Sequence, residues 1–268
     1  MKRGGTIVAV LCVALFAGCA QTGDQRAEAP APRGNPDDPP VIGERAEARV
    51  RAKAHTDLAA AYYELGNMGV ALEEVRIALA ADPNYAPAHN VQGLINMELR
   101  DNAAADASFK RALAIAPNDP DVAHNYGFFL CSTGREQDGL QQYMAAIRNP
   151  LYTGPAKSWA AAGRCVEKRD PAEAEKFYDR ALKLDPNTIG AMMPYAHLQY
   201  RKGALAEARS LVGRYLKLVE PTAESLWLGV RVERKLGDKI AEGNYATQLR
   251  RRFPNSKEYQ DFLRGNFD

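Results

Sequence analysis

A repeat of about 34 residues constrains this chain more than any other feature of its sequence. Pro83, Pro117, Pro186 and Pro254 each close a stretch of helical pattern; the first two lie 34 residues apart, and the next step of 69 is about twice that. Three of these stretches end almost identically, in the letters ALAADP, ALAIAP and ALKLDP. Proline lacks an N–H and restricts the residue before it, so it ends a helix. The spacing therefore predicts helical units that recur along the chain.

Small and large residues recur at fixed places within these units. An alanine lies twelve residues before a repeat proline and a bulky residue lies eight before it, as in Ala71 with Val75, Ala105 with Phe109, and Ala174 with Tyr178. Small residues let one helix approach the next, and we expect this at Gly93, Gly127, Gly163 and Gly229. Large side chains are expected to fill the space between repeats, namely Tyr62, Phe109, Tyr143, Tyr178 and Tyr245.

The pattern resembles the tetratricopeptide repeat family, whose first-helix pattern is matched in type and spacing by Trp159, Ala162, Gly163 and Val166. The resemblance implies an all-α superhelix of about six helix-turn-helix repeats, near residues 52–85, 86–119, 120–153, 154–188, 189–221 and 222–256. Residues 44–51 extend the first helix and residues 258–267 cap the last pair, which gives a domain spanning 44–268. The matches shift by a residue around Arg169–Pro171, Gly203 and Gly237.

The N-terminus predicts export. Lys2 and Arg3 precede an apolar run over residues 6–16, which is too short to span a membrane and is typical of a secretory signal. The small residues before Cys19 resemble the lipobox of bacterial lipoproteins, which implies a signal peptide over 1–18 and lipidation of Cys19. Phe16 departs from the usual leucine of that motif, and an ordinary signal peptide with an incidental cysteine is the alternative. Ala20, rather than aspartate, after the cysteine resembles lipoproteins sorted to the outer membrane.

Residues 19–43 are rich in proline and charge and lack apolar periodicity. Such a segment cannot bury enough apolar surface to order itself. We expect a lipidated, disordered spacer that holds the folded part away from the membrane surface.

The composition excludes several classes of function. Lys and Arg number 35 against 33 Asp and Glu, so no strong global field favours nucleic acid. No nucleotide-binding loop or catalytic signature occurs, so neither an enzyme nor a cofactor is expected. His55, His89 and His124 recur 34 and 35 residues apart, which the repeat explains better than a metal site does. Arg250, Arg251 and Arg252 favour a solvated helix end over a phosphate or lipid patch.

Cys131 and Cys165 lie 34 residues apart, in the same position of neighbouring repeats. Because an exported protein enters an oxidising compartment, we predict a disulfide that joins repeats three and four. Two buried thiols are the alternative.

The combination of lipobox, short spacer and six repeats resembles the type IV pilus biogenesis lipoproteins known as secretin pilotins. The stretches 58–71 and 125–134 are especially similar to that family. The resemblance implies a monomer, anchored by its lipid to the periplasmic face of the outer membrane, that binds secretin subunits and promotes their targeting and multimerisation. Helix geometry gives candidate contacts in a groove along repeats one to three: Tyr63, Asn90, Leu94, Met97, His124 and Phe128. A lipoprotein scaffold for outer-membrane protein assembly or for cell-wall enzymes is the alternative.

Overall fold

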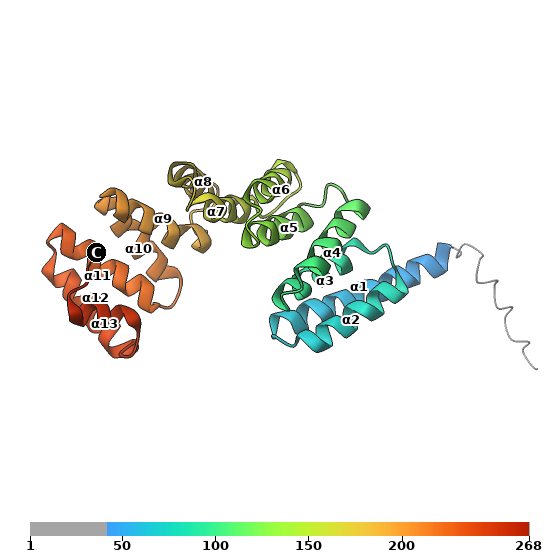
Figure 1. Cartoon of the computed structure of the whole chain (residues 1–268), viewed down its shortest axis with the longest axis horizontal. Helices are drawn as coiled ribbons and strands as arrows, with labels where there is room; N and C mark the ends of the chain where they lie inside the picture. The colour runs from blue at the N-terminus through green and yellow to red at the C-terminus, as the bar shows by residue number, and fades with distance from the viewer. Residues whose placement is uncertain (1–41, 268) are drawn as a thin grey trace, which may run out of the picture. The chain divides into compact units, whose positions relative to one another are not determined.

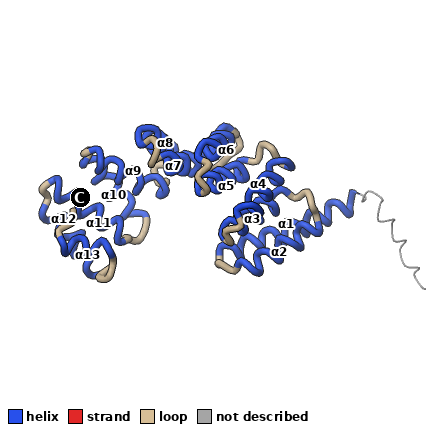
Figure 2. Tube along the Cα trace, in the orientation of Figure 1, coloured by secondary structure: helices blue, strands red, loops and turns tan. Residues whose placement is uncertain are grey.

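The computed structural model describes residues 42–267. These residues form thirteen α-helices and no strand (Figures 1 and 2). The predicted signal peptide, the lipidation site Cys19 and nearly all of the spacer lie outside the described residues.

Twelve of the helices form six antiparallel pairs, which confirms the expected all-α architecture. The pairs are α1 (Ile42–Glu64) with α2 (Met68–Ala81), α3 (Ala86–Glu98) with α4 (Asn102–Ile115), α5 (Pro120–Ser132) with α6 (Glu136–Arg148), α7 (Pro155–Val166) with α8 (Pro171–Leu184), α9 (Ile189–Lys202) with α10 (Leu205–Leu218), and α11 (Ala223–Leu236) with α12 (Lys239–Arg252). Each pair packs against the next in chain order, as in a superhelix of tetratricopeptide repeats (Figure 1).

Local chemistry sets the helix ends where the sequence predicted them. The second helices α2, α4, α8 and α12 each end two residues before a repeat proline. Aspartates begin several helices, because the side chains of Asp101, Asp170 and Asp238 each accept a hydrogen bond from a backbone N–H of the first turn. These caps and stops confine each helix to a fixed part of the repeat.

The predicted small and large residues meet within each pair. A Cβ atom added to Gly163 in α7 would lie 2.5 Å from the ring of Tyr178 in α8, and one added to Gly93 would lie 2.7 Å from the ring of Phe109. The rings of Phe109 and Tyr178 also reach the next repeat, as expected of side chains that fill the space between repeats. The ring centroids of Phe109 and Tyr126 are 5.6 Å apart, and those of Tyr178 and Tyr195 are 6.0 Å apart.

The frame shifts in the sequence have a structural cause in the turns inside the pairs. The first three pairs turn through residues 65–67, 99–101 and 133–135, whereas the fourth uses 167–170 and the last two use only 203–204 and 237–238. Gly203 and Gly237 both have φ of 79°, so a glycine allows each short turn. Turns of unequal length shift the repeat pattern of the sequence by a residue, while the two helices still pack as a pair.

The C-terminal segment caps the last pair, as predicted. Helix α13 (Lys257–Arg264) packs on α11, and Phe262 and Phe267 lie against Trp227 with ring centroids 6.4 Å and 5.3 Å away. The hydroxyl of Tyr200 in α9 also donates a hydrogen bond to the carbonyl oxygen of Phe267. No helix within residues 42–267 has the length and apolar character needed to cross a bilayer.

Candidate binding surface

The first helices of successive pairs contact one another and form one face of the domain. Three cavities open on this face in the second half of the array. One of about 360 Å³ lies between α5 and α7, one of about 310 Å³ lies between α5, α7 and the start of α9, and one of about 460 Å³ is lined by α7, α9 and α11. We refer to the side of the molecule lined by α1, α3, α5, α7, α9 and α11 as the first-helix face.

Three of the six candidate groove residues contribute to packing. Leu94 and Met97 are half-buried against the hydrophobic cluster that contains Phe109. Tyr63 is half-buried against the cluster of the first repeat, and burial together with the nearby Glu98 raises the pKa of its hydroxyl. Each keeps part of its side chain exposed and can still contact a partner.

Two other candidates connect neighbouring repeats. The amide of Asn125 in α5 donates a hydrogen bond of 3.2 Å to the side-chain oxygen of Asn90 in α3. His124 Nδ1 and Ser158 Oγ in α7 are joined by a hydrogen bond of 2.7 Å. Asn90 and His124 therefore hold adjacent first helices together, a role that the sequence pattern alone did not indicate.

His124 is held in its neutral form by its surroundings. Burial, together with the positive charges of Lys157 and Arg164, lowers the pKa of His124 to about 4. Ser158 is fully buried and is also hydrogen-bonded to Tyr152 at 2.9 Å. The junction of repeats three and four thus contains a buried polar network that includes an uncharged imidazole.

Phe128 differs from the other candidates because its side chain is largely available. It is 43% exposed, although it is a large apolar residue, and it borders the cavity between α5 and α7. An exposed aromatic ring beside a cavity is a common anchor for a protein partner.

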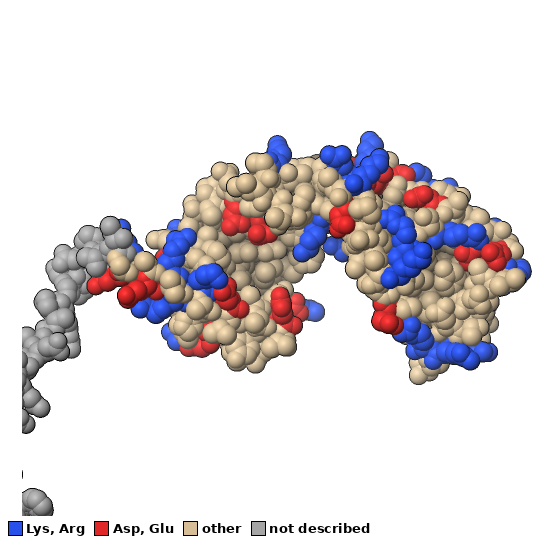
Figure 3. Space-filling view, turned by 180° about the vertical axis from the view of Figure 1, so that it is seen from behind, with Lys and Arg blue, Asp and Glu red and all other residues tan. Residues whose placement is uncertain are grey.

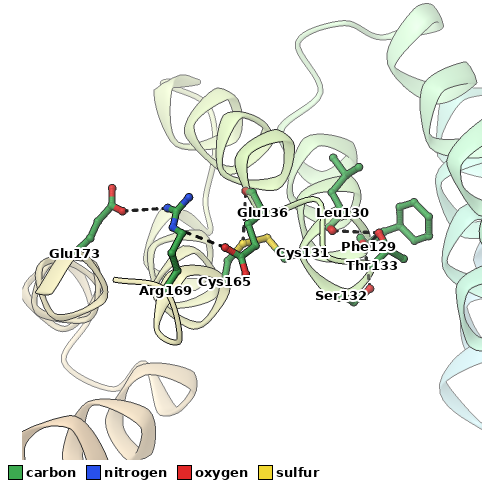
Figure 4. Close-up of a disulfide and its surroundings, with 9 residues drawn as sticks. All are labelled: Phe129, Leu130, Cys131, Ser132, Thr133, Glu136, Cys165, Arg169 and Glu173. Carbon is green, nitrogen blue, oxygen red and sulfur yellow. Dashed lines mark hydrogen bonds and ion pairs between the residues drawn. A yellow bond between two sulfur atoms is a disulfide. The ribbon is translucent and has the colours of Figure 1, made fainter. Parts of the chain in front are cut away.

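The predicted disulfide is present in the structure. Cys131 in α5 and Cys165 in α7 are bonded, with their Cα atoms 5.5 Å apart (Figure 4). Close by, Arg169 forms ion pairs with Glu136 at 3.8 Å and with Glu173 at 3.5 Å. A covalent bond and an ion-pair network therefore both join the third repeat to the fourth.

The histidines do not come together. His55 lies 2.6 Å from Glu74, and His89 lies 3.0 Å from the carbonyl oxygen of Pro83. Within residues 42–267, no group of three or more histidine, cysteine, aspartate or glutamate side chains is arranged to hold a metal ion.

Arg250, Arg251 and Arg252 occupy the last turn of α12, where positive charge suits the helix dipole. Arg252 is also paired with Glu220. This placement agrees with a solvated helix end.

Three cations in and just after α7 also belong to this surface, although they were not among the predicted contacts. Lys157, Arg164 and Lys168 all border cavities of the first-helix face. Their spacing of seven and four residues, which matches helical periodicity, is the signal that could have found them. On the side of the molecule drawn in Figure 3, positive and negative side chains are interspersed.

Comparison with known proteins identifies the repeats and full-length relatives. Tetratricopeptide repeat sequence models match residues 86–119 and 166–223. The chain is 27% identical over 263 residues to the type IV pilus assembly protein PilF of Pseudomonas aeruginosa, and the match covers 98% of each sequence. The solved PilF structure superposes with a TM-score of 0.74 at 28% identity, over 82% of this chain and 99% of that chain.

A second solved structure is more similar in sequence. PilW, described as a widely conserved type IV pilus biogenesis factor, is 30% identical, with a TM-score of 0.71 over 79% of this chain and 98% of its own. The fold and the first-helix face define the class as a tetratricopeptide repeat scaffold of the kind that binds partner proteins. Within that class, the chain belongs to the family of type IV pilus biogenesis proteins that includes PilF and PilW.

Proposed function

We propose that this protein is an outer-membrane lipoprotein of type IV pilus biogenesis that acts as a pilotin: it binds secretin subunits and promotes their targeting and multimerisation. The observation that carries the proposal is the match to PilF, which extends over 98% of both sequences and so includes the N-terminal segment as well as the repeats. The lipobox-like residues before Cys19 support a lipid anchor at that end.

The first-helix face supports the binding role. Repeat arrays hold segments of partner proteins on such faces, and Phe128 offers an exposed aromatic ring there. The lipid would supply the location and the repeats would supply the contact with secretin, so no bond is made or broken in the process. The protein would be a monomer on the periplasmic side of the membrane.

Secretin assembly in a strain that lacks the gene tests the proposal. Complementation with the wild type should restore secretin multimers in the outer-membrane fraction, whereas Phe128→Ser should restore far fewer. Ile240→Ser is the matched control, because Ile240 is a 79% exposed apolar residue on the second helix of the last pair. Normal multimers with Phe128→Ser, or equal losses with both variants, would count against binding through this face.

The anchor is tested separately with Cys19→Ser. The wild type should incorporate radiolabelled palmitate and fractionate with the outer membrane, and the variant should do neither. If loss of the gene leaves twitching motility intact but damages the cell envelope, the alternative of a scaffold for outer-membrane or cell-wall assembly would replace the pilotin role.

A further inference from the structure

Two cations of α7, Lys157 and Arg164, are followed by Lys168 in the turn after the helix. All three are exposed, and at 3.6 residues per turn the side chains of Lys157 and Arg164 fall within about 20° of one line down α7. Within residues 42–267, none of the three forms an ion pair or a hydrogen bond with another residue. They are therefore free to bind charge from outside the domain.

The three cations border the three cavities of the first-helix face. Arg164 borders all three of them, Lys157 borders the one of about 310 Å³, and Lys168 borders the ones of about 360 Å³ and 460 Å³. The cations therefore lie where the surface is hollowed, so that a bound segment could meet them in sequence.

The carboxylates around these cavities already have partners. Glu167 accepts hydrogen bonds from Tyr178 and Arg201. Glu136 is paired with Arg169, and Glu224 lies 2.9 Å from His197.

Two aspartates also lie near these cations. The side chain of Asp185 accepts hydrogen bonds from the Asn187 N–H and the Thr188 hydroxyl. Asp121 faces Lys157 but forms no ion pair with it. Lys157 therefore interacts with Asp121 only at longer range, and Arg164 and Lys168 form no ion pair with any residue of 42–267.

The charges of Lys157 and Arg164 also affect the pKa values of neighbouring groups. Burial is the main reason why the pKa of His124 is low, and Lys157 and Arg164 add to the shift. Arg164 also favours the ionised form of Tyr143 and Tyr178, although burial raises the pKa of both hydroxyls overall. The charges of Lys157 and Arg164 therefore act on His124, which lines the cavity of about 310 Å³.

An apolar contact lies beside the cations. Phe128 borders the same cavity as Arg164 and Lys168, together with the Cys131–Cys165 disulfide. A partner that neutralises the cations can cover this ring at the same time.

We propose that α5, α7 and α9 form a docking surface for an extended acidic peptide segment of a partner protein. Carboxylates of the segment would pair with Lys157, Arg164 and Lys168, and one of its apolar side chains would cover Phe128. The proposal rests on the proposed function only in taking this face as the one that partners use. It adds the chemistry that the partner must have.

Peptide binding to the full chain in detergent tests the proposal. The probe is a fluorescein-labelled peptide of ten residues that contains Asp and Glu around a central Phe, compared with the same peptide in which Asn and Gln replace the acids. Fluorescence anisotropy should show binding of the acidic peptide alone, and the affinity should fall as salt is raised. Arg164→Gln with Lys168→Gln should weaken binding about tenfold, since each exposed pair contributes modestly.

A matched control uses α8 of the same repeat. Lys176 and Arg180 are also exposed, but border none of the three cavities, so Lys176→Gln with Arg180→Gln should bind the peptide as the wild type does. Arg164→Lys with Lys168→Arg keeps the charges and should retain binding. This rescue separates loss of charge from loss of fold.

Several outcomes would overturn the proposal. These are equal binding of the neutral peptide, equal losses in the two charge-neutralised variants, or no binding of the acidic peptide. Binding of phosphatidylglycerol vesicles that is lost with Arg164→Gln and Lys168→Gln, in the absence of peptide binding, would assign the surface to lipid instead. If the peptide fails to bind while Phe128→Ser still impairs secretin assembly, this inference fails and the proposed function stands.

Discussion

Removing the disulfide should destabilise the middle of the array by a predictable amount. The bond between Cys131 and Cys165 closes a loop of 34 residues. In the chain-entropy treatment of cross-links, a loop of that length restricts the unfolded chain by about 4 kcal/mol. The double variant Cys131→Ala with Cys165→Ala should therefore lose about 4 kcal/mol of unfolding free energy, because the native contacts of repeats three and four otherwise remain.

Urea denaturation of the wild type and the variant, each with and without dithiothreitol, measures this loss. With a denaturant dependence of about 2.5 kcal/mol per molar, the midpoint should fall by about 1.5 M. Reduction should shift the wild type to the midpoint of the variant and leave the variant unchanged. Hydrogen exchange should quicken most in α5 to α7, since the bond joins α5 to α7 and encloses α6.

Two results would refute this reasoning. If reduced wild type and double variant both kept the midpoint of the oxidised protein, the cross-link would not limit the unfolded chain. If dithiothreitol also shifted the variant, the change in the wild type could not be assigned to this bond.

Three smaller changes test the packing, the buried histidine and the caps. Gly163→Ala would place a methyl group 2.5 Å from the fully buried ring of Tyr178 and should lower the free energy of unfolding by about 2 kcal/mol in urea denaturation. Gly213→Ala has open space around it in α10 and should raise the free energy of unfolding by up to about 1 kcal/mol. The reverse order of stabilities would contradict the packing argument. Because the pKa of His124 falls from 6.5 to about 4 on folding, the unfolded chain takes up the proton first as the pH is lowered. The free energy of unfolding should therefore fall by up to about 3 kcal/mol from pH 6.5 to pH 4. The thermal midpoint of His124→Gln should fall less over the same range, and an identical fall would exclude this residue as a cause. Asp170→Ala should remove the cap of α8 and lower the free energy of unfolding by about 1 kcal/mol, and an unchanged thermal midpoint would show that the cap does not matter.

The helix pairs were predictable because their determinants are local. Each repeat proline ends a helix by its own geometry, so the ends near Pro83 and Pro186 needed no knowledge of the fold. The disulfide was predictable for a related reason. Equal positions in neighbouring repeats must lie close together, which places Cys131 near Cys165 once the repeat length is known.

The same reasoning could not assign roles to the side chains of the first-helix face. Asn90 and His124 lie 34 residues apart, and nothing in the repeat pattern indicates that each side chain bonds to the next repeat instead of contacting a partner. That outcome depends on helix phase and on which hydrogen-bond partner lies opposite, such as the buried Ser158. Lys157 and Arg164 were not predicted because most charged side chains are simply exposed to solvent, and only their neighbours in the structure show that they border cavities.

The position of the disulfide links stability to binding. It lies between the repeat that carries Phe128 and the repeat that carries Arg164 and Lys168, and it borders the cavity that all three share. In a repeat array each unit is held mainly by its neighbours, so the interface of repeats three and four could open without unfolding the ends. A covalent bond at that interface fixes the distance between the aromatic ring and the cations. If acidic segments bind there, the variant without the disulfide should lose affinity for them more steeply than it loses helix content on mild heating, and parallel losses would show that the bond serves stability alone.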